Sequence, residues 1–148
     1  MTNPEITLIL VKPDAVADGL TGEVLHRLEK EGLKILNCRM LRLDAALLKE
    51  HYVHLAHLPF FPEIEKFMSS GPVVAVALQG TNAIERVREL LGPTDSTKAP
   101  KGTIRGDLGK DKMHNVLHAS DSHETARTEL IRFFGKADPR VYACLLPS

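Results

Sequence analysis

The chain has 148 residues, of which 43% are apolar and 26% are charged. That is enough for a sizeable core and typical of a globular protein. The 19 basic and 19 acidic residues give no formal net charge, which argues against a dedicated nucleic-acid-binding protein, because a basic excess supplies most of that affinity. Two cysteines, Cys38 and Cys144, make no disulfide framework, and the apolar run Ile6 to Val11 is too short to span a bilayer. We therefore expect one domain over residues 1–148, cytoplasmic and not inserted in a membrane.

Runs of apolar and β-branched residues predict four strands. The first is nearly continuous and is expected to be buried on both faces. Pro13 ends it and leaves Lys12 at its C-terminal edge. The predicted strands cover residues 6–11, 33–43, 73–78 and 115–118.

Helical spacing is found between these strands and after the last one. Thr21 is expected to be an N-cap, with Leu20 and Leu25 as a hydrophobic staple, while Asn82 and Glu85 resemble a capping box. The predicted helices run from Thr21 to a stop at Gly32, from a cap at Asp44 to Leu58, through a short segment ending at Met68, from Asn82 to Leu91, and from a cap at Asp121 or Ser122 to Gly135.

Residues 92–112 form a long stretch rich in Gly, Pro, Thr, Asp and Lys, with neither helical nor strand periodicity. A loop of that length in a compact domain is usually functional or disordered. The order of elements around it predicts a ferredoxin-like α+β fold, in which a βαββαβ four-stranded antiparallel sheet carries helices on its faces and an added C-terminal helix.

Glycine-rich phosphate motifs are missing from the sequence, so any nucleotide site must be built from side chains. Lys12 at a strand end could reach a cleft, although a solvated lysine is the commoner case. Arg88 lies beside the apolar stripe of its helix and could either cover core or bind a phosphate. Arg105 lies between glycines in the long loop, and together these cations would suit a polyphosphate.

Histidines offer two patterns that suggest a metal. His51, His54 and His57 recur at every third position of a predicted helix, but a solvated helix face is the simpler interpretation. His114 and His118 have the spacing of helical ligands, yet the strand predicted there would separate them by roughly 13 Å, too far for one zinc ion.

His118 is the candidate nucleophile. It precedes a strand-to-helix turn, where the N–H groups of a helix N-terminus favour an anion, and a neutral imidazole there could attack phosphorus and store the phosphoryl group. Glu129, at the border of the apolar face of the next helix, could orient the ring. The alternative is that His118 is a structural histidine and Glu129 a surface acid.

Taken together, five segments resemble the nucleoside diphosphate kinase family in order and spacing, over nearly the whole chain. The segments are residues 12–14, 59–61, 70–74, 102–107 and 115–122, with the sequences KPD, PFF, SGPVV, GTIRGD and NVLHASDS. The resemblance implies ping-pong transfer of the γ-phosphoryl group from a nucleoside triphosphate, mainly ATP, to a nucleoside diphosphate. In this scheme His118 is phosphorylated.

The same resemblance implies roles for eight further residues. Positions that hold the phosphates and ribose match Lys12, Arg88, Thr94, Arg105 and Asn115. Phe60 matches the aromatic that stacks on the base, and Tyr52 and Glu129 match residues that position the histidine. Mg²⁺ would arrive on the nucleotide phosphates, with few or no direct protein ligands, and the chain would form a homo-oligomer, either a tetramer or a hexamer.

The sequence also departs from the family pattern. His114 stands where Arg is usual, Ala119 where Gly is frequent, and Asp95 where Pro is common, and the chain stops soon after Tyr142. Two other functions are considered. A catalytically silent nucleotide-binding regulator would be expected to lack His118 or Lys12, and an RNA-binding domain of this fold would carry aromatic residues on its strands. Neither expectation is met by the sequence.

Overall fold

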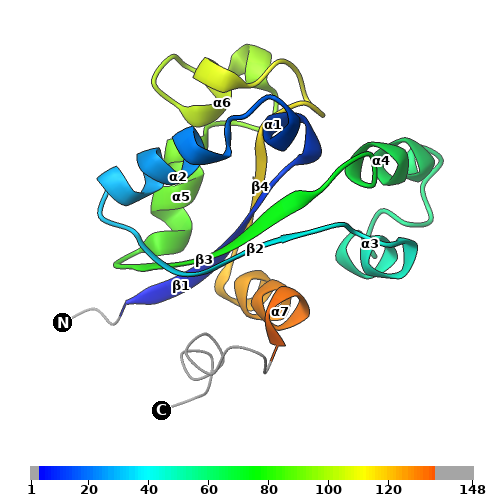
Figure 1. The fold of residues 1–148 in the computed structure, drawn as a ribbon, viewed down its shortest axis with the longest axis horizontal. Coiled ribbons are helices and arrows are strands. Elements are labelled where there is room, and N and C mark those ends of the chain that lie inside the picture. The colour runs from blue at the N-terminus through cyan, green and yellow to red at the C-terminus, as the bar shows by residue number, and fades with distance from the viewer. Residues whose placement is uncertain (1–3, 136–148) are drawn as a thin grey trace.

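The computed structural model describes residues 4–135, and its centre is a four-stranded antiparallel sheet in the order β2-β3-β1-β4. This confirms the predicted ferredoxin-like α+β fold, which Figure 1 shows face-on. The prediction of one domain over residues 1–148 remains a prediction, and Tyr142 and Cys144 lie outside the described residues. The strands are β1 (Glu5–Val11), β2 (Lys34–Leu41), β3 (Val73–Gly80) and β4 (Leu117–Ala119).

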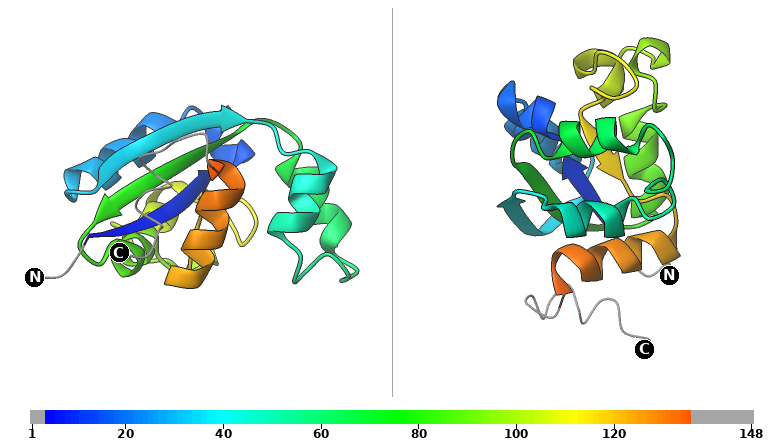
Figure 2. Two further views of the ribbon diagram at one scale, coloured as in Figure 1. Left: turned by 90° about the horizontal axis from the view of Figure 1, so that it is seen from below. Right: turned by 90° about the vertical axis from the view of Figure 1, so that its right-hand side faces the viewer.

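Helices cover both faces of this sheet and its end (Figure 2). Two of the shortest, the 3-10 turn η1 and the helix α6, lie in the segment predicted to be an irregular loop. The helical elements are α1 (Pro13–Ala17), α2 (Thr21–Lys30), α3 (Ala45–His51), α4 (Phe61–Met68), α5 (Ala83–Leu91), η1 (Ser96–Lys98), α6 (Ile104–Leu108) and α7 (His123–Phe133).

The core has two layers, because the side chains of a strand alternate between the faces of the sheet. On one face, Ile9 and Val11 pack with Val24 of α2 and Val87 of α5. On the other face, Leu10 belongs to a second cluster together with side chains of α3, α4 and α7. β1 is buried on both faces from Thr7 onward, as its continuous apolar run predicts.

Strand register positions the site. β1 lies between β3 and β4, and Leu10 pairs with His118 across the β1–β4 ladder. The backbone N–H of Lys12 donates to the carbonyl of Val116 at 2.9 Å. The end of β1 and the start of β4 therefore lie side by side, although more than a hundred residues separate them in the sequence.

Several local predictions are wrong. Thr21 is the first helical residue rather than the cap, and Leu20 occupies the cap position without a side-chain hydrogen bond. Helix α1 is not expected from the sequence, because Pro13 ends the strand before it; proline also suits the first turn of a helix, and Pro13 begins α1. Asn82 has a left-handed backbone and makes no capping bond.

Two predicted helix caps are confirmed, and two predicted element boundaries differ from the structure. Asp44 and Ser122 cap their helices by accepting from the backbone N–H groups of Leu47 and Thr125. α3 ends at His51, seven residues earlier than predicted, and β4 begins at Leu117 rather than Asn115. No helix within residues 4–135 is long and apolar enough to cross a membrane.

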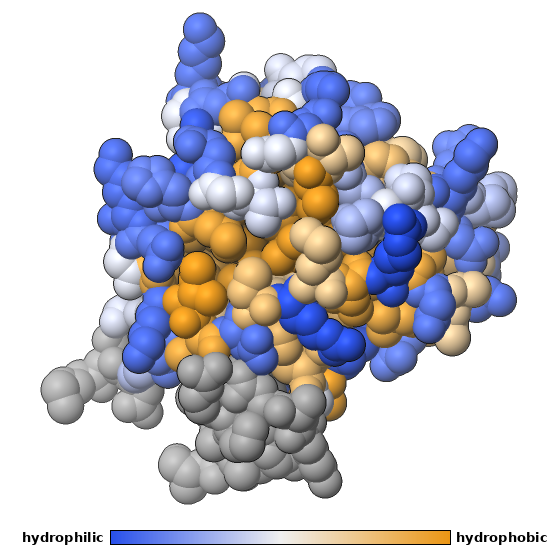
Figure 3. All heavy atoms as spheres, viewed as in Figure 1, coloured by the Kyte–Doolittle hydropathy of each residue, from blue (hydrophilic) through white to orange (hydrophobic). Residues whose placement is uncertain are grey.

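The face seen in Figure 3 carries apolar side chains near its centre, ringed by hydrophilic ones, where β2 and β3 lie in Figure 1. β2 is an edge strand, paired with β3 alone within the described part of the chain. Its Met40 is 61% exposed, and its Cys38 is an exposed free cysteine.

Candidate active site

All nine residues predicted for the site line one cleft of about 1190 Å³. The cleft opens where β1 ends and β4 begins, and residues of the α3–α4 segment and of α7 also line it. It exceeds the usual size of a small-ligand pocket, roughly 300–1000 Å³. The nine residues are Lys12, Tyr52, Phe60, Arg88, Thr94, Arg105, Asn115, His118 and Glu129.

Lys12 is not the solvated lysine of the simpler interpretation. Its Nζ donates to Oδ1 of Asn115 at 2.7 Å and to the carbonyl of Met113 at 3.4 Å. Burial lowers the pKa of Lys12 to about 8; the charge of Arg105 adds to this effect, and Asp14 and Asp111 oppose it. The buried amide of Asn115 also donates to the carbonyls of Thr94 and Lys112. Asn115 thus fixes Lys12 against the long loop.

Arg105 ties the loop to β4. Its guanidinium donates to the carbonyls of Asn115 at 3.1 Å, Gly92 at 3.2 Å and Leu117 at 2.8 Å. Burial, followed by the nearby charge of Arg88, lowers the pKa of Arg105 to about 10, so the group is cationic at neutral pH. A guanidinium has more N–H donors than these bonds use, and the remaining ones can meet an anion in the cleft. The exposed Arg88 lines the same cleft.

Val116 joins these groups to β4 through a strained backbone. Its φ is 78°, a left-handed conformation that costs a β-branched residue about 1–2 kcal/mol or more. Val116 is buried, and its carbonyl accepts from the N–H of Lys12. Strain of this kind persists only where surrounding contacts enforce it, and it concentrates at functional sites.

Glu129 holds His118 through one ring nitrogen. Nε2 of His118 lies 2.7 Å from Oε2 of Glu129, and Ser120 Oγ donates to Oε1 at 2.6 Å. Burial alone would raise the pKa of Glu129, but the hydrogen bonds from His118 and Ser120 leave it below its usual range. The carboxylate is therefore ionised at neutral pH and favours a proton on Nε2, so Nδ1 of His118 keeps its lone pair.

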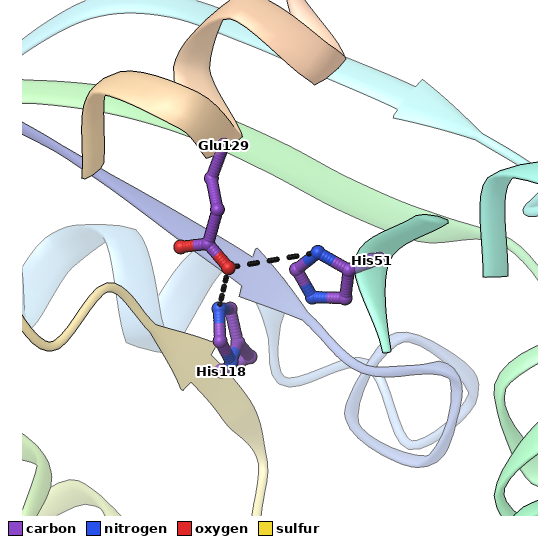
Figure 4. Close-up of side chains that lie close together, drawn as sticks. All are labelled: His51, His118 and Glu129. Carbon is purple, nitrogen blue, oxygen red and sulfur yellow. Dashed lines mark hydrogen bonds and ion pairs between the residues drawn. The ribbon is translucent and has the colours of Figure 1, made fainter. Parts of the chain in front are cut away.

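His51 was predicted to lie on a solvated helix face, and this is wrong. Its side chain is 1% exposed, and its Nδ1 is 3.5 Å from Oε2 of Glu129. Figure 4 shows both histidines turned toward the carboxylate of Glu129. His54 and His57 are exposed as predicted. A signal was available, because His51 follows Leu48 by three residues and so shares its buried helix face. Ser120 and Arg132 were missed as well.

The cluster of His51, His118 and Glu129 has the donor types of a zinc site, with ligand atoms within 4.8 Å of one another. However, Arg132 Nη1 lies 2.9 Å from Nδ1 of His51. A cation there would displace that hydrogen bond and meet the charge of Arg132. The geometry therefore fits a hydrogen-bonded assembly better than a metal centre.

The remaining predicted residues surround this centre. The ring of Tyr52 packs edge-on against His51 with centroids 4.8 Å apart. Burial raises the pKa of the Tyr52 hydroxyl to about 12, so it stays neutral. Phe60, 46% exposed, lies at the start of α4 in the mouth of the cleft. Thr94 offers its carbonyl to Asn115.

Each departure from the family pattern within the described residues has a local explanation. Ala119 has no left-handed backbone, so no glycine is needed there. Asp95 caps η1 by accepting from the N–H and hydroxyl of Thr97. His114 lies 3.1 Å from the carboxylate of Asp111 and packs edge-on against Phe67. These substitutions leave the contacts around His118 in place.

The family model described as nucleoside diphosphate kinase matches residues 5–138. The chain belongs to the nucleoside diphosphate kinase family. Nucleoside diphosphate kinases of Dehalococcoides mccartyi are 47% identical to it over 90% of this chain and 94% of theirs. That of Staphylothermus marinus is 49% identical over 86% of this chain and 91% of its own.

Solved structures of the family agree with the fold. The Aquifex aeolicus nucleoside diphosphate kinase superposes with a TM-score of 0.85 at 46% identity, covering 88% of this chain and 95% of that one. A halophilic nucleoside diphosphate kinase from Halobacterium salinarum, in complex with CDP, gives a TM-score of 0.88 at 38% identity, covering 98% and 100%. The family expected from the sequence motifs is thus confirmed, and a catalytically silent regulator is not favoured.

Proposed function

We propose that the chain transfers the γ-phosphoryl group of a nucleoside triphosphate, mainly ATP, to a nucleoside diphosphate through a phosphohistidine at His118. The observation that carries this proposal is the hydrogen bond between Nε2 of His118 and Glu129. It leaves Nδ1 as the nucleophile, in a cleft that Lys12, Arg88 and Arg105 also line. Both half-reactions use the same groups, as ping-pong transfer requires.

In the first half-reaction the lone pair of His118 Nδ1 forms a bond to the γ-phosphorus, and the bond from phosphorus to the bridging oxygen breaks. The nucleoside diphosphate leaves with that electron pair, and the imidazole, still protonated on Nε2, becomes cationic. Glu129 stabilises this positive charge from 2.7 Å away. In the second half-reaction a terminal oxygen of another nucleoside diphosphate attacks the phosphohistidine and restores neutral His118.

Substrate binding is assigned to residues that surround the nucleophile. Lys12, Arg88 and Arg105 place positive charge where the phosphates must lie, and electrostatic positioning is the main requirement of phosphoryl transfer. Thr94 and Asn115 are assigned to the phosphates and ribose. Phe60 is assigned to the base, because an exposed aromatic ring stacks on any base and predicts little preference among nucleotides. Tyr52, like Glu129, is assigned to positioning His118.

The divalent ion, Mg²⁺ in this proposal, binds to the nucleotide phosphates. Within residues 4–135, the one cluster with metal-ligand spacing has two nitrogen donors, which suit Mg²⁺ poorly because it prefers oxygen ligands. When bound on the nucleotide, the ion would neutralise phosphate charge. The chain's own part is to hold the phosphates in line with Nδ1 of His118.

We also place the protein in the cytoplasm as a homo-oligomer, a tetramer or a hexamer. The observation in favour of assembly is the apolar area around the edge strand β2, including the 61% exposed Met40. Exposed strand edges and contiguous apolar patches are the surfaces through which proteins associate.

Intact-protein mass spectrometry tests the chemistry. After brief mixing with ATP and Mg²⁺, the protein should carry one acid-labile phosphoryl group that added GDP removes. His118→Ala should carry none, whereas His57→Ala, a change at an exposed histidine outside the cleft lining, should behave as the unaltered chain. An adduct that persists in His118→Ala would overturn the assignment of the nucleophile.

A further inference from the structure

His51 and Arg132 lie beside the proposed nucleophile but take no part in the mechanism described above. The ring of His51 packs edge-on against His118, with centroids 4.7 Å apart, and also contacts Tyr52 and Phe133. Nη1 of Arg132 lies 2.9 Å from its Nδ1, while Nε2 has no hydrogen-bond partner within residues 4–135. A buried histidine with one nitrogen bonded to an arginine requires an explanation.

The contact with Arg132 determines the tautomer of His51. A guanidinium can only donate, so Nδ1 of His51 must accept and cannot carry a proton. The proton of the neutral ring then resides on Nε2. Since Nδ1 is the atom that faces Oε2 of Glu129, 3.5 Å away, His51 in this tautomer cannot donate to Glu129. That carboxylate oxygen is left for Nε2–H of His118, 2.7 Å away.

We propose that Arg132 and His51 are positioning residues that reserve Oε2 of Glu129 for His118 and thereby direct phosphoryl transfer to Nδ1 of His118. The inference rests on the proposed function. Without Arg132, His51 could take a proton on Nδ1 and donate it to Glu129. His118 would then share or lose its partner, its ring could turn over, and either nitrogen could face the phosphate.

The surroundings favour a neutral His51. Burial, followed by the nearby His118, lowers its pKa to about 3; Glu129 opposes the shift, and Arg132 and His54 add to it. Arg132 also forms an ion pair with the exposed Glu50, whose Oε1 lies 3.3 Å from its Nε. A guanidinium has donors and no acceptor, so Nδ1 of His51 remains the acceptor in its contact with Arg132.

The test is the site of phosphorylation within the His118 ring, which a merely structural role of Arg132 would not alter. Phosphorus NMR distinguishes Nδ1 from Nε2 adducts. The unaltered chain, after ATP and Mg²⁺, should show the Nδ1 adduct alone. Arg132→Met, which keeps the aliphatic bulk and loses the donor, should show a mixture. Its kcat should fall about 10- to 100-fold, as expected for a misplaced reacting group, while the KM for nucleotide changes less than about twofold.

A double variant separates positioning from folding. In Arg132→Met/His51→Phe the ring against His118 is retained, but no nitrogen can compete for Glu129, so Nδ1 selectivity and most of kcat should return. His57→Ala is the matched control, since it removes an exposed histidine near His51 in sequence and should change neither quantity. A double variant that stays mixed, or a single variant that remains purely Nδ1 at full rate, overturns the proposal.

Nitrogen NMR of the unaltered chain tests the inference even if Arg132→Met does not fold. With labelled histidine, His51 should be protonated on Nε2 and bare on Nδ1, and a proton on Nδ1 contradicts the proposal. Failure of the proposed function and failure of the positioning role give different results. If the unaltered chain forms no phosphohistidine, the proposed function fails. If it forms one on Nδ1 and Arg132→Met does so equally fast, only the positioning role fails.

Discussion

At the scale of single residues, the cleft is built from polar groups whose partners fix their charge and direction. Lys12 rests on Asn115, Arg105 on backbone carbonyls, and His118 on Glu129. In each case hydrogen bonds orient a group that would otherwise sample several rotamers. Orientation of this kind is what an enzyme contributes to phosphoryl transfer, where little other protein chemistry is needed.

Loss of the proton from Lys12 should cause an alkaline limb, a fall at high pH, in the pH profile of kcat/KM. The pKa of Lys12 is lowered to about 8, so the cation is present below that pH and lost above it. We expect kcat/KM to fall by roughly tenfold per pH unit well above pH 8, because kcat/KM reports ionisations of the free enzyme. Lys12→Arg, whose charge persists at all accessible pH values, should be slower but lack this limb. A limb that persists in Lys12→Arg would rule out Lys12 as its origin.

At Val116, unlike at most buried positions, substitution by glycine should destabilise the protein less than substitution by alanine. Val116→Ala and Val116→Gly both remove buried methyl groups, but only glycine adopts a φ of 78° without strain. We expect the glycine variant to have the larger free energy of unfolding in urea, by about 1 kcal/mol. The same pair at Val76, buried in β3 without positive φ, should show alanine as the more stable. If alanine is also the better residue at position 116, the backbone there is not strained.

At the scale of elements, the long segment between α5 and β4 is an ordered scaffold. Thr103 caps α6 by accepting from the N–H of Gly106, and Asp107 accepts from the N–H of Gly102 and from Arg27 of α2. These contacts hold Arg105 at the cleft. They are polar and local, so they leave no trace in apolar periodicity, and the sequence therefore predicted only an irregular loop.

Gly106 should tolerate no side chain. A Cβ there would lie 2.7 Å from the carbonyl carbon of Pro100 and 2.8 Å from Oγ1 of Thr103, and backbone cannot yield cheaply. Gly106→Ala should lower the free energy of unfolding by about 1–3 kcal/mol and raise the KM for nucleotide through Arg105. Gly22→Ala, in α2 with nothing within 4 Å, should instead stabilise by about 0.5–1 kcal/mol. Unchanged stability and KM in Gly106→Ala would show that α6 does not depend on this close approach.

Prediction from sequence succeeded where one residue type has one strong preference. Apolar β-branched runs predict the strands. The structure also brings Lys12 and His118, which the sequence predicts near strand ends, into one cleft. Prediction failed where a residue has two roles. Pro13 ends β1 but also begins α1, and His51 repeats like a solvated face yet packs beneath His118. Tertiary contacts impose the left-handed backbone of Val116, so no local sequence pattern predicts it.

At the scale of the whole molecule, the site and the proposed assembly surface lie on different parts of the sheet. The cleft lies at the end of β1 and the start of β4, the edge strand on one side, whereas β2 is the opposite edge in the order β2-β3-β1-β4. Substitutions at β2 should therefore change subunit association and leave the contacts of His118 largely unaltered.

Met40 provides a test of assembly. Met40→Lys places a charge on the β2 edge, a device by which natural sheets avoid pairing. Size-exclusion chromatography with light scattering should show a shift toward smaller species. Ile131→Lys, at a 41% exposed apolar position on α7, should keep the mass of the unaltered chain. If Met40→Lys also keeps that mass, the subunits associate through another surface.

The pairing of Leu10 with His118 has a consequence for refolding. The two paired residues are far apart in the sequence, with most of the described chain between them. Contacts between such distant residues form slowly, because closing a long loop costs entropy. The contact of Lys12 with Asn115 lies beside that ladder, and we expect the two to form together. During refolding, phosphotransfer activity should then return later than the circular dichroism signal of the helices. The rate at which activity returns would therefore report how fast β4 pairs with β1.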